Sequence, residues 1–347
     1  MIPYRTQRTL KRLLIGLLIF VILAAALLVC WFLWLQRYVV YTDDGAKLDF
    51  DRLLQFSEGE AAQPPESTPA VDFVYNDGTN VTEPVSRELA QFSGYYVTLE
   101  ELKLDLAAVT EMLNALPEGS TVMLEVKNNR GQFGYSSAFG PTADGLDPTQ
   151  MGELIQSLKA AGHYLIAEVN AFQDYEYFMA DTVNWSHNAH GFAKDGGDGS
   201  LWYDKQNQCY WLNPTTDGAR SYLIQIISEL RALGFHEVVL SEFRISDTDM
   251  IHFPGDKIAT LNETAELLVK TCATETFAVS FVREKVDLTL PQGRTRLYLQ
   301  GAAASEVASL AAQTGFQDPA VRLVFLVDTN DTRFDAYSVI RPQEMAR

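Results

Sequence analysis

The sequence is poor in cysteine, has fewer basic than acidic residues, and lacks the glycine patterns that bind nucleotides. Three cysteines in 347 residues exclude a fold held mainly by disulfides. The 45 Asp and Glu residues outnumber the 27 Lys and Arg residues, and the resulting formal net charge of −18 disfavours nucleic-acid binding. No P-loop, dinucleotide-binding glycine pattern or Gly-x-Ser-x-Gly elbow follows an apolar run. We therefore expect neither nucleotide-dependent nor serine-hydrolase chemistry.

Charge is absent from one long stretch near the N-terminus. Residues 13–35 contain no charged side chain, and at about 1.5 Å per residue they can cross a hydrocarbon core of about 30 Å. Residues 1–12 carry four basic and no acidic side chains, so they should face the cytoplasm and leave the C-terminal part outside. The run exceeds the roughly 7 to 15 residues of a signal-peptide core and lacks a small-x-small cleavage site. We predict an uncleaved signal anchor in the cell membrane, followed by an extracellular domain.

The chain beyond this predicted span is strongly acidic and rich in apolar residues. Residues 1–37 contribute five positive charges and no negative ones, so the remainder carries −23. Cys209 and Cys272 are the only cysteines beyond the span, and a disulfide between them is possible in an oxidising exterior. With 47% hydrophobic residues, the chain can bury one large core.

Composition divides the sequence into four parts. Apolar runs on either side of Asp43-Asp44-Gly45 predict a short hairpin, and residues 55–83 are rich in Pro, Glu, Ser and Thr, as in a linker. We expect a cytoplasmic tail at 1–12, a transmembrane helix at 13–35, a juxtamembrane hairpin and linker at 36–91, and one folded domain at 92–347.

In this domain, short apolar runs alternate with segments of helical periodicity. Strands are predicted at 95–98, 121–126, 164–169, 237–243, 277–282, 295–299 and 321–327, with a weaker eighth around Val339. Helices are predicted at 103–116, 148–161, 217–233, 262–271 and 302–314. The alternation favours an α/β fold of the (β/α)8 TIM-barrel type, with an open doubly wound sheet as the alternative.

Several strand-end segments together match a known family pattern. They are Gly94-Tyr-Tyr-Val-Thr, Glu125-Val-Lys-Asn-Asn-Arg-Gly131, Tyr135-Ser-Ser, Phe172-Gln-Asp174, Trp202-Tyr-Asp204, Trp211-Leu-Asn-Pro214, Gly234-Phe-His-Glu-Val and Ser241-Glu-Phe-Arg244. On these segments the chain resembles the putative glycoside hydrolase domain family of bacterial surface proteins, which are TIM barrels of the glycosidase-like superfamily. The resemblance covers roughly residues 94–244. It implies that the chain binds a cell-envelope or environmental glycan, and it leaves open whether the chain is a hydrolase or a non-cleaving binder of glycan or protein.

The sequence departs from the family pattern where activity is decided. Ser241 replaces the Asp of the fourth strand, and Glu125 replaces the Asp of the second. Glu168 and Gln173 stand where the third strand carries Arg and Lys. Because most glycosidases need two carboxyl groups and a serine cannot replace either, these departures put catalysis in question.

Three carboxylates are candidates for catalysis, namely Glu125, Asp174 and Glu242. Lys127 shares the face of Glu125 in a strand of period two and should hold Glu125 ionised. The same alternation should direct Glu242 away from Ser241 toward the helices, where it would pair with Arg244 or with a cation of a helix, unless a β-bulge re-aims it.

Candidate substrate-binding residues come from the strand ends and the aromatic-rich loop between them. They are Tyr96, Lys127, Trp202, Asp204, Trp211, Asn213 and Arg244. Flat aromatic rings here suit stacking with sugars, although a small core beneath a long loop explains them equally well. His187 and His190 lack the acidic partners of a metal site, so we predict no metal and no other cofactor. The expected partners are a polysaccharide or cell-wall glycan and, through the N-terminal helix, the membrane.

Overall fold

The structure is a computed structural model that describes residues 39–42, 45–48, 89–182, 185–196, 199–251 and 253–342. The chain divides into two units, Met1–Thr79 and Asn80–Arg347. In the first, β1 (Val39–Thr42) pairs antiparallel with β2 (Gly45–Leu48), so the predicted hairpin is present, with Gly45 inside its second strand. The predicted span at 13–35 and linker at 55–83 lie outside the described residues. Within the described part of the chain, no helix is both long and apolar enough to cross a membrane.

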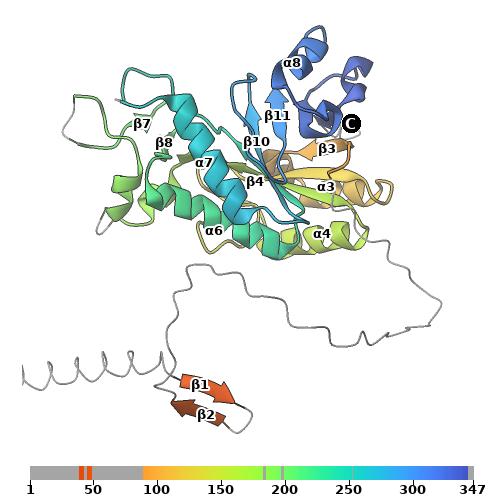
Figure 1. Ribbon diagram of the computed structural model, residues 1–347. Helices are drawn as coiled ribbons and strands as arrows, with labels where there is room; N and C mark the ends of the chain where they lie inside the picture. The colour runs from red at the N-terminus through yellow and green to blue at the C-terminus, as the bar shows by residue number, and fades with distance from the viewer. Residues whose placement is uncertain are drawn as a thin grey trace, which may run out of the picture. The chain divides into compact units, whose positions relative to one another are not determined.

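Eight parallel strands in the second unit close into a barrel (Figure 1). In spatial order they are β3 (Ser93–Val97), β4 (Thr121–Lys127), β5 (Tyr164–Asn170), β9 (Glu237–Ser241), β10 (Ala278–Arg283), β11 (Leu297–Gln300), β12 (Leu323–Leu326) and β13 (Ser338–Pro342). The weakly predicted eighth strand is β13, and its pairing with β3 closes the barrel. The TIM-type prediction is therefore confirmed, and the open sheet is excluded.

Helices follow most of the barrel strands and cover its outside. They are α2 (Leu99–Leu104), α3 (Leu106–Asn114), α4 (Pro148–Ala160), α6 (Asp217–Leu233), α7 (Lys257–Cys272), α8 (Val307–Thr314) and α9 (Pro319–Arg322). Helix α6 has the predicted bounds, and it packs against α7. The single helix predicted at 103–116 is instead divided at Asp105, whose carboxylate accepts a hydrogen bond from the Ala108 amide (2.9 Å) and so begins α3.

The middle of the barrel is filled by apolar side chains from seven of its strands. These are Met123, Ile166, Val239, Val282, Tyr298, Val324 and Ile340. The remaining strand, β3, contributes Gly94, where an added Cβ would lie 2.7 Å from Ile340 Cδ1. This layer separates the N-terminal ends of the strands, here called the floor, from the C-terminal ends, here called the rim.

The floor contains a buried ionic network that the sequence analysis did not anticipate. Glu237, which is fully buried, pairs with Arg296 at 2.5 Å. Its carboxylate also accepts hydrogen bonds from the hydroxyls of Ser280 (2.5 Å), Tyr164 (3.0 Å) and Tyr298 (3.0 Å). Arg296 donates to two main-chain carbonyl groups as well. The charges of this pair are thus satisfied on both sides.

A long excursion between β5 and β9 contains the aromatic-rich loop. It forms a small antiparallel sheet of β6 (Gln173–Asp174), β8 (Cys209–Trp211) and β7 (Tyr203–Asp204), with the short helices α5 (Glu176–Met179) and η2 (Ser186–His190). A further short helix, η3 (Thr332–Ala336), precedes β13. Cys209 and Cys272 are both free and buried, so the disulfide that the sequence allowed does not form.

Candidate active site

Two glutamates lie side by side at the rim. Glu125 on β4 and Glu168 on β5 are partners in the register of these neighbouring strands. Met123 and Ile166, two residues earlier on each strand, face the barrel interior, so both glutamates face it as well. Both side chains are partly buried. The fold therefore places two carboxyl groups together where TIM-barrel enzymes carry their active sites.

The surroundings of this pair favour a retained proton. Burial, followed by the charge of Glu168, raises the pKa of Glu125 to about 7, although its carboxylate accepts a hydrogen bond from the Leu99 amide (2.9 Å). Burial also raises the pKa of Glu168, and hydrogen bonds from the hydroxyls of Tyr96 and Ser241 oppose that rise. With a pKa of about 7, Glu125 keeps its proton over part of the neutral pH range, and the raised pKa of Glu168 acts in the same direction.

Glu242 joins this region because the backbone changes direction after β9. Its φ angle of 49° is left-handed, which is uncommon for a residue other than glycine and interrupts the strand alternation. Its carboxylate accepts hydrogen bonds from Arg244 Nε (2.7 Å) and Gln173 Nε2 (3.5 Å), and its charge contributes to the raised pKa of Glu168. The predicted Arg244 partner is confirmed. The expectation that Glu242 faces the helical layer is wrong, because the left-handed residue keeps the carboxylate at the rim.

Lys127 and Asp174 form a separate buried pair. The register of β4 shifts between Glu125 and Lys127, so the two residues no longer share a face. Lys127 Nζ lies 3.0 Å from Asp174 and donates to the Asn170 carbonyl (2.9 Å), while Asp174 also accepts from the Tyr222 hydroxyl (2.9 Å). Both side chains of the pair are 0% exposed. The expected Lys127–Glu125 contact is therefore wrong, and the structure leaves Asp174 no access to a substrate.

The predicted sugar platform is mostly buried. Trp202 and Trp211 are 8% and 1% exposed, and the guanidinium of Arg244 covers the Trp211 ring at 5.0 Å. Asp204 accepts a hydrogen bond from Trp211 Nε1 (3.1 Å), and the Asn213 side chain accepts from the amide two residues later (3.0 Å). These two polar residues thus organise turns, and the two tryptophans pack within the excursion instead of presenting open rings. Of the predicted binding residues, Tyr96 and Arg244 remain at the rim cavities.

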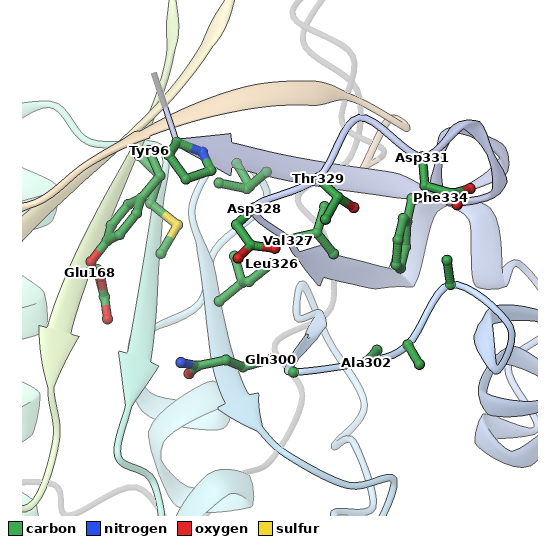
Figure 2. Close-up of a pocket in the computed structure, with 16 residues that line it drawn as sticks. Tyr96, Glu168, Gln300, Ala302, Leu326, Val327, Asp328, Thr329, Asp331 and Phe334 are labelled. Carbon is green, nitrogen blue, oxygen red and sulfur yellow. Dashed lines mark hydrogen bonds between the residues drawn. The ribbon is translucent and has the colours of Figure 1, made fainter. Parts of the chain in front are cut away.

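Two cavities open at the rim next to these carboxylates. The larger, of about 630 Å³, lies beside Glu168 and Tyr96 and continues over the ends of β11, β12 and β13 (Figure 2). The smaller, of about 160 Å³, contains Glu242 and Arg244. Gln300 lines both cavities, so they adjoin each other. Of the two paired glutamates, Glu168 lines the larger cavity and Glu125 lines neither. A carboxyl group that keeps its proton beside a cavity of this size can act as a general acid on a bound molecule.

The histidines of the excursion pack against a tyrosine. His187 stacks on Tyr177 with ring centroids 4.2 Å apart, and His190 Nδ1 lies 2.7 Å from the Tyr177 hydroxyl. Across the described ranges, no three His, Cys, Asp or Glu residues are grouped so that they could hold a metal ion.

Glu168, Gln300 and Asp328 line the larger cavity but were not among the predicted site residues. A signal for Glu168 exists in the sequence. Strand β4 reads Thr-Val-Met-Leu-Glu-Val-Lys and β5 reads Tyr-Leu-Ile-Ala-Glu-Val-Asn, with Glu-Val at the same place in each. Aligning the two strands as neighbours pairs their glutamates. Asp328 directly follows the strand predicted at 321–327, but the segment Asp328-Thr-Asn-Asp is typical of a turn and favoured a structural role. For Gln300 the sequence carries no comparable signal.

A protein-family model described as "Putative glycosyl hydrolase domain" matches residues 94–280, more than half of the chain. No curated protein matches the sequence.

Among solved structures, a hypothetical protein from Ruminiclostridium thermocellum is 17% identical with a TM-score of 0.44, covering 54% of this chain and 96% of that one. The glycoside hydrolase domain of PelA from Pseudomonas aeruginosa is 11% identical with a TM-score of 0.46, at 75% and 97% coverage. An exo-β-N-acetylglucosaminidase from Vibrio harveyi is 9% identical with a TM-score of 0.48, and the match covers 73% of this chain but only 50% of that enzyme.

Proposed function

This chain belongs to the putative glycosyl hydrolase domain family, and from that premise we propose that its barrel hydrolyses a glycan with the glutamates at its rim. The observation that carries the proposal is the pairing of Glu125 with Glu168 in register on adjacent strands. The raised pKa values of both residues supply what a glycosidase acid needs, which is a carboxyl group that keeps its proton near neutral pH.

In the proposed reaction, the protonated member of the pair gives its proton to the glycosidic oxygen as the bond to the anomeric carbon breaks. The oxygen of a water molecule forms the new bond to the anomeric carbon, directly or after a covalent intermediate, and the proton that this water loses passes to a carboxylate acting as base. Glu242 supplies the second carboxylate that hydrolysis with either retention or inversion requires. The ion pair with Arg244 holds the Glu242 side chain at the rim, where the charge of Glu242 helps to raise the pKa of Glu168. In this assignment Glu242 takes the role of the family Asp, which Ser241 replaces and cannot fill.

The test is a screen of the full-length protein against a panel of soluble glycans, with release of reducing ends as the readout. For a cleaved glycan, Glu125→Gln and Glu168→Gln should each lower kcat by about 100- to 10,000-fold, because a general acid contributes about that factor. Glu263→Gln, on the exposed side of α7, is the matched control and should leave kcat unchanged.

The same screen separates hydrolysis from binding. If a glycan binds with a measurable Kd and the wild-type protein releases no reducing ends from it, the barrel is a non-cleaving binder and the hydrolase proposal is wrong. Turnover that survives both Glu125→Gln and Glu168→Gln would equally contradict the assignment of the acid.

We also propose that residues 13–35 anchor the chain in the cell membrane with the barrel outside the cytoplasm. The uncharged run of 23 residues and the basic residues before it support this arrangement. In cell fractionation, the full-length chain should stay in the membrane fraction at high salt and dissolve in detergent. Protease added to intact spheroplasts should degrade the barrel. A barrel protected from protease, or a chain released by salt, would contradict the proposal.

A further inference from the structure

The larger rim cavity has a polar end and an apolar end. Figure 2 shows Tyr96 and Glu168 at one end, Phe334 and Ala302 at the other, and Asp328 between them. The volume of about 630 Å³ lies within the range of about 300 to 1,000 Å³ that is usual for small-molecule sites. Most of its lining comes from residues 300–342, beyond the part of the chain that the family model matches. Its selectivity is therefore a property of this chain's own C-terminal strands.

The charges that line this cavity have one sign. Its lining contains three carboxyl groups and no Lys, Arg or His. Asp331 is neutralised by Arg333, which reaches it with Nε at 2.9 Å and Nη2 at 2.6 Å. Glu168 accepts the hydrogen bonds of Tyr96 and Ser241. In the described part of the chain, no side chain pairs with the exposed carboxylate of Asp328. One uncompensated negative charge thus remains on the cavity wall.

The absence of cations is specific to this cavity. The adjoining smaller cavity is lined by four cationic side chains, Arg244, Lys257, Arg283 and Lys285. Three of these four form ion pairs with carboxylates. Along one rim, therefore, the side next to Glu168 is cation-free and the side next to Glu242 is not. An anionic group would meet unfavourable charge in the larger cavity, and a cationic group would meet favourable charge.

We propose that the larger cavity is a subsite for a sugar unit with a free amine, that is, an un-acylated hexosamine within the glycan. Its ammonium group pairs with Asp328, and the C–H face of its ring lies against the partly exposed apolar wall formed by Val327 and Ala302. The net charge of −18 draws a cationic polymer toward the protein. A divalent metal ion is a poor occupant, since it needs several oxygen ligands and Asp328 supplies one carboxylate.

This inference deepens the proposed function and rests on it, but the two can be tested apart. The probes are an oligosaccharide of glucosamine with all amines free and the fully N-acetylated oligosaccharide of the same length. Calorimetry with the full-length protein should show tighter binding of the amine form. Asp328→Asn should weaken that binding about tenfold, because a hydrogen bond to a charged group is lost, and should leave binding of the N-acetylated form unchanged. Asp249→Asn, at another exposed carboxylate, is the control and should change neither.

Three outcomes would overturn the inference. The first is equal affinity for the two oligosaccharides, and the second is amine binding that Asp328→Asn leaves intact, which would mark a nonspecific attraction to an acidic protein. The third is cleavage of the N-acetylated form alone, which would support hydrolysis while excluding the amine subsite. Binding of the amine form through Asp328 without cleavage would instead uphold the subsite and contradict the hydrolase.

Discussion

The floor and the rim of this barrel both contain buried or partly buried glutamates, but the groups around the glutamate carboxylates differ between the two ends. At the floor, Glu237 has a guanidinium and three hydroxyl donors around its carboxylate. At the rim, Glu125 has a main-chain amide and, as its neighbour, a second carboxylate, Glu168. The floor network surrounds its carboxylate with a cation and hydroxyl donors, whereas the surroundings of the rim pair raise the pKa of both glutamates.

This difference indicates what each end of the barrel is for. A compensated ion pair holds strands together but has no spare proton or open coordination to offer a ligand. A carboxyl pair with raised pKa values costs stability at neutral pH, which is typical of a site kept for chemistry. The predictions below contrast the two ends, from the largest expected effect to the smallest.

The largest effect should come from the floor. Arg296→Met leaves the Glu237 carboxylate buried without its cation and should lower the free energy of unfolding by about 3 to 5 kcal/mol. Urea unfolding followed by tryptophan fluorescence measures the loss. Arg333→Met removes an exposed ion pair with Asp331 and should change the free energy of unfolding little, because solvent screens that pair. Equal losses in the two variants would show that the floor network does not stabilise the barrel.

At the rim, removing a carboxyl group should instead raise the free energy of unfolding at high pH. The pKa of Glu125 is raised to about 7, so the folded protein binds more protons than the unfolded chain between about pH 4.5 and pH 7. The stability that this proton contributes is present below pH 4.5 and is lost as the pH rises through 7. Glu125→Gln should therefore stabilise the protein at pH 8 by about 1 to 3 kcal/mol and flatten the decline over this window. A variant less stable than wild type at pH 8 would contradict the account.

The rate of glycan hydrolysis should depend on the same protonation of the rim pair. If the pair is the acid, kcat/KM on a cleaved glycan should fall about tenfold for each pH unit above about 7, where the proton is lost. Initial rates measured from pH 5 to pH 9 test this. A profile that stays flat up to pH 9 would remove the pair from the chemistry.

The smallest effect should come from Tyr96. Its hydroxyl donates to Glu168 and opposes the rise of that pKa, so Tyr96→Phe should move the decline in kcat/KM to higher pH, by less than about one unit. The free energy of unfolding should change by only about 0.5 to 1.5 kcal/mol. A decline that moves to lower pH would contradict the assigned direction of this hydrogen bond.

The barrel could be predicted from the sequence because its signals are local. The alternation of apolar runs with helical segments located the eight barrel strands, β13 only weakly, but not β6, β7 and β8 of the small sheet. The start of α4 at Pro148 and the bounds of α6 followed from helical periodicity. The division of the first helix at Asp105 was missed, since a capping aspartate inside an apolar-periodic segment looks like any polar residue of the exposed face.

The site was predicted less well, because it depends on contacts between distant segments. A register shift in β4 separates Lys127 from Glu125 and sends it to Asp174, and strand parity cannot foresee that shift. Glu168 was treated as a departure from the family pattern, although the register makes it the partner of Glu125. The burial of Trp211 follows from the packing of the excursion, and an aromatic-rich segment has the same composition whether its rings are open or covered.

The raised pKa of Glu125 beside Glu168 is the central claim, and a ¹³C NMR titration of the glutamate carboxyl carbons tests it most directly. Labelled wild-type protein should show one rim carboxyl titrating near pH 7, and Glu168→Gln should lower the pKa of Glu125 because the neighbouring charge is gone. Glu237→Gln, at the floor, should leave the rim titration in place. If Glu125 and Glu168 both titrate near pH 4.5 in the folded protein, the rim holds no retained proton and the account is wrong.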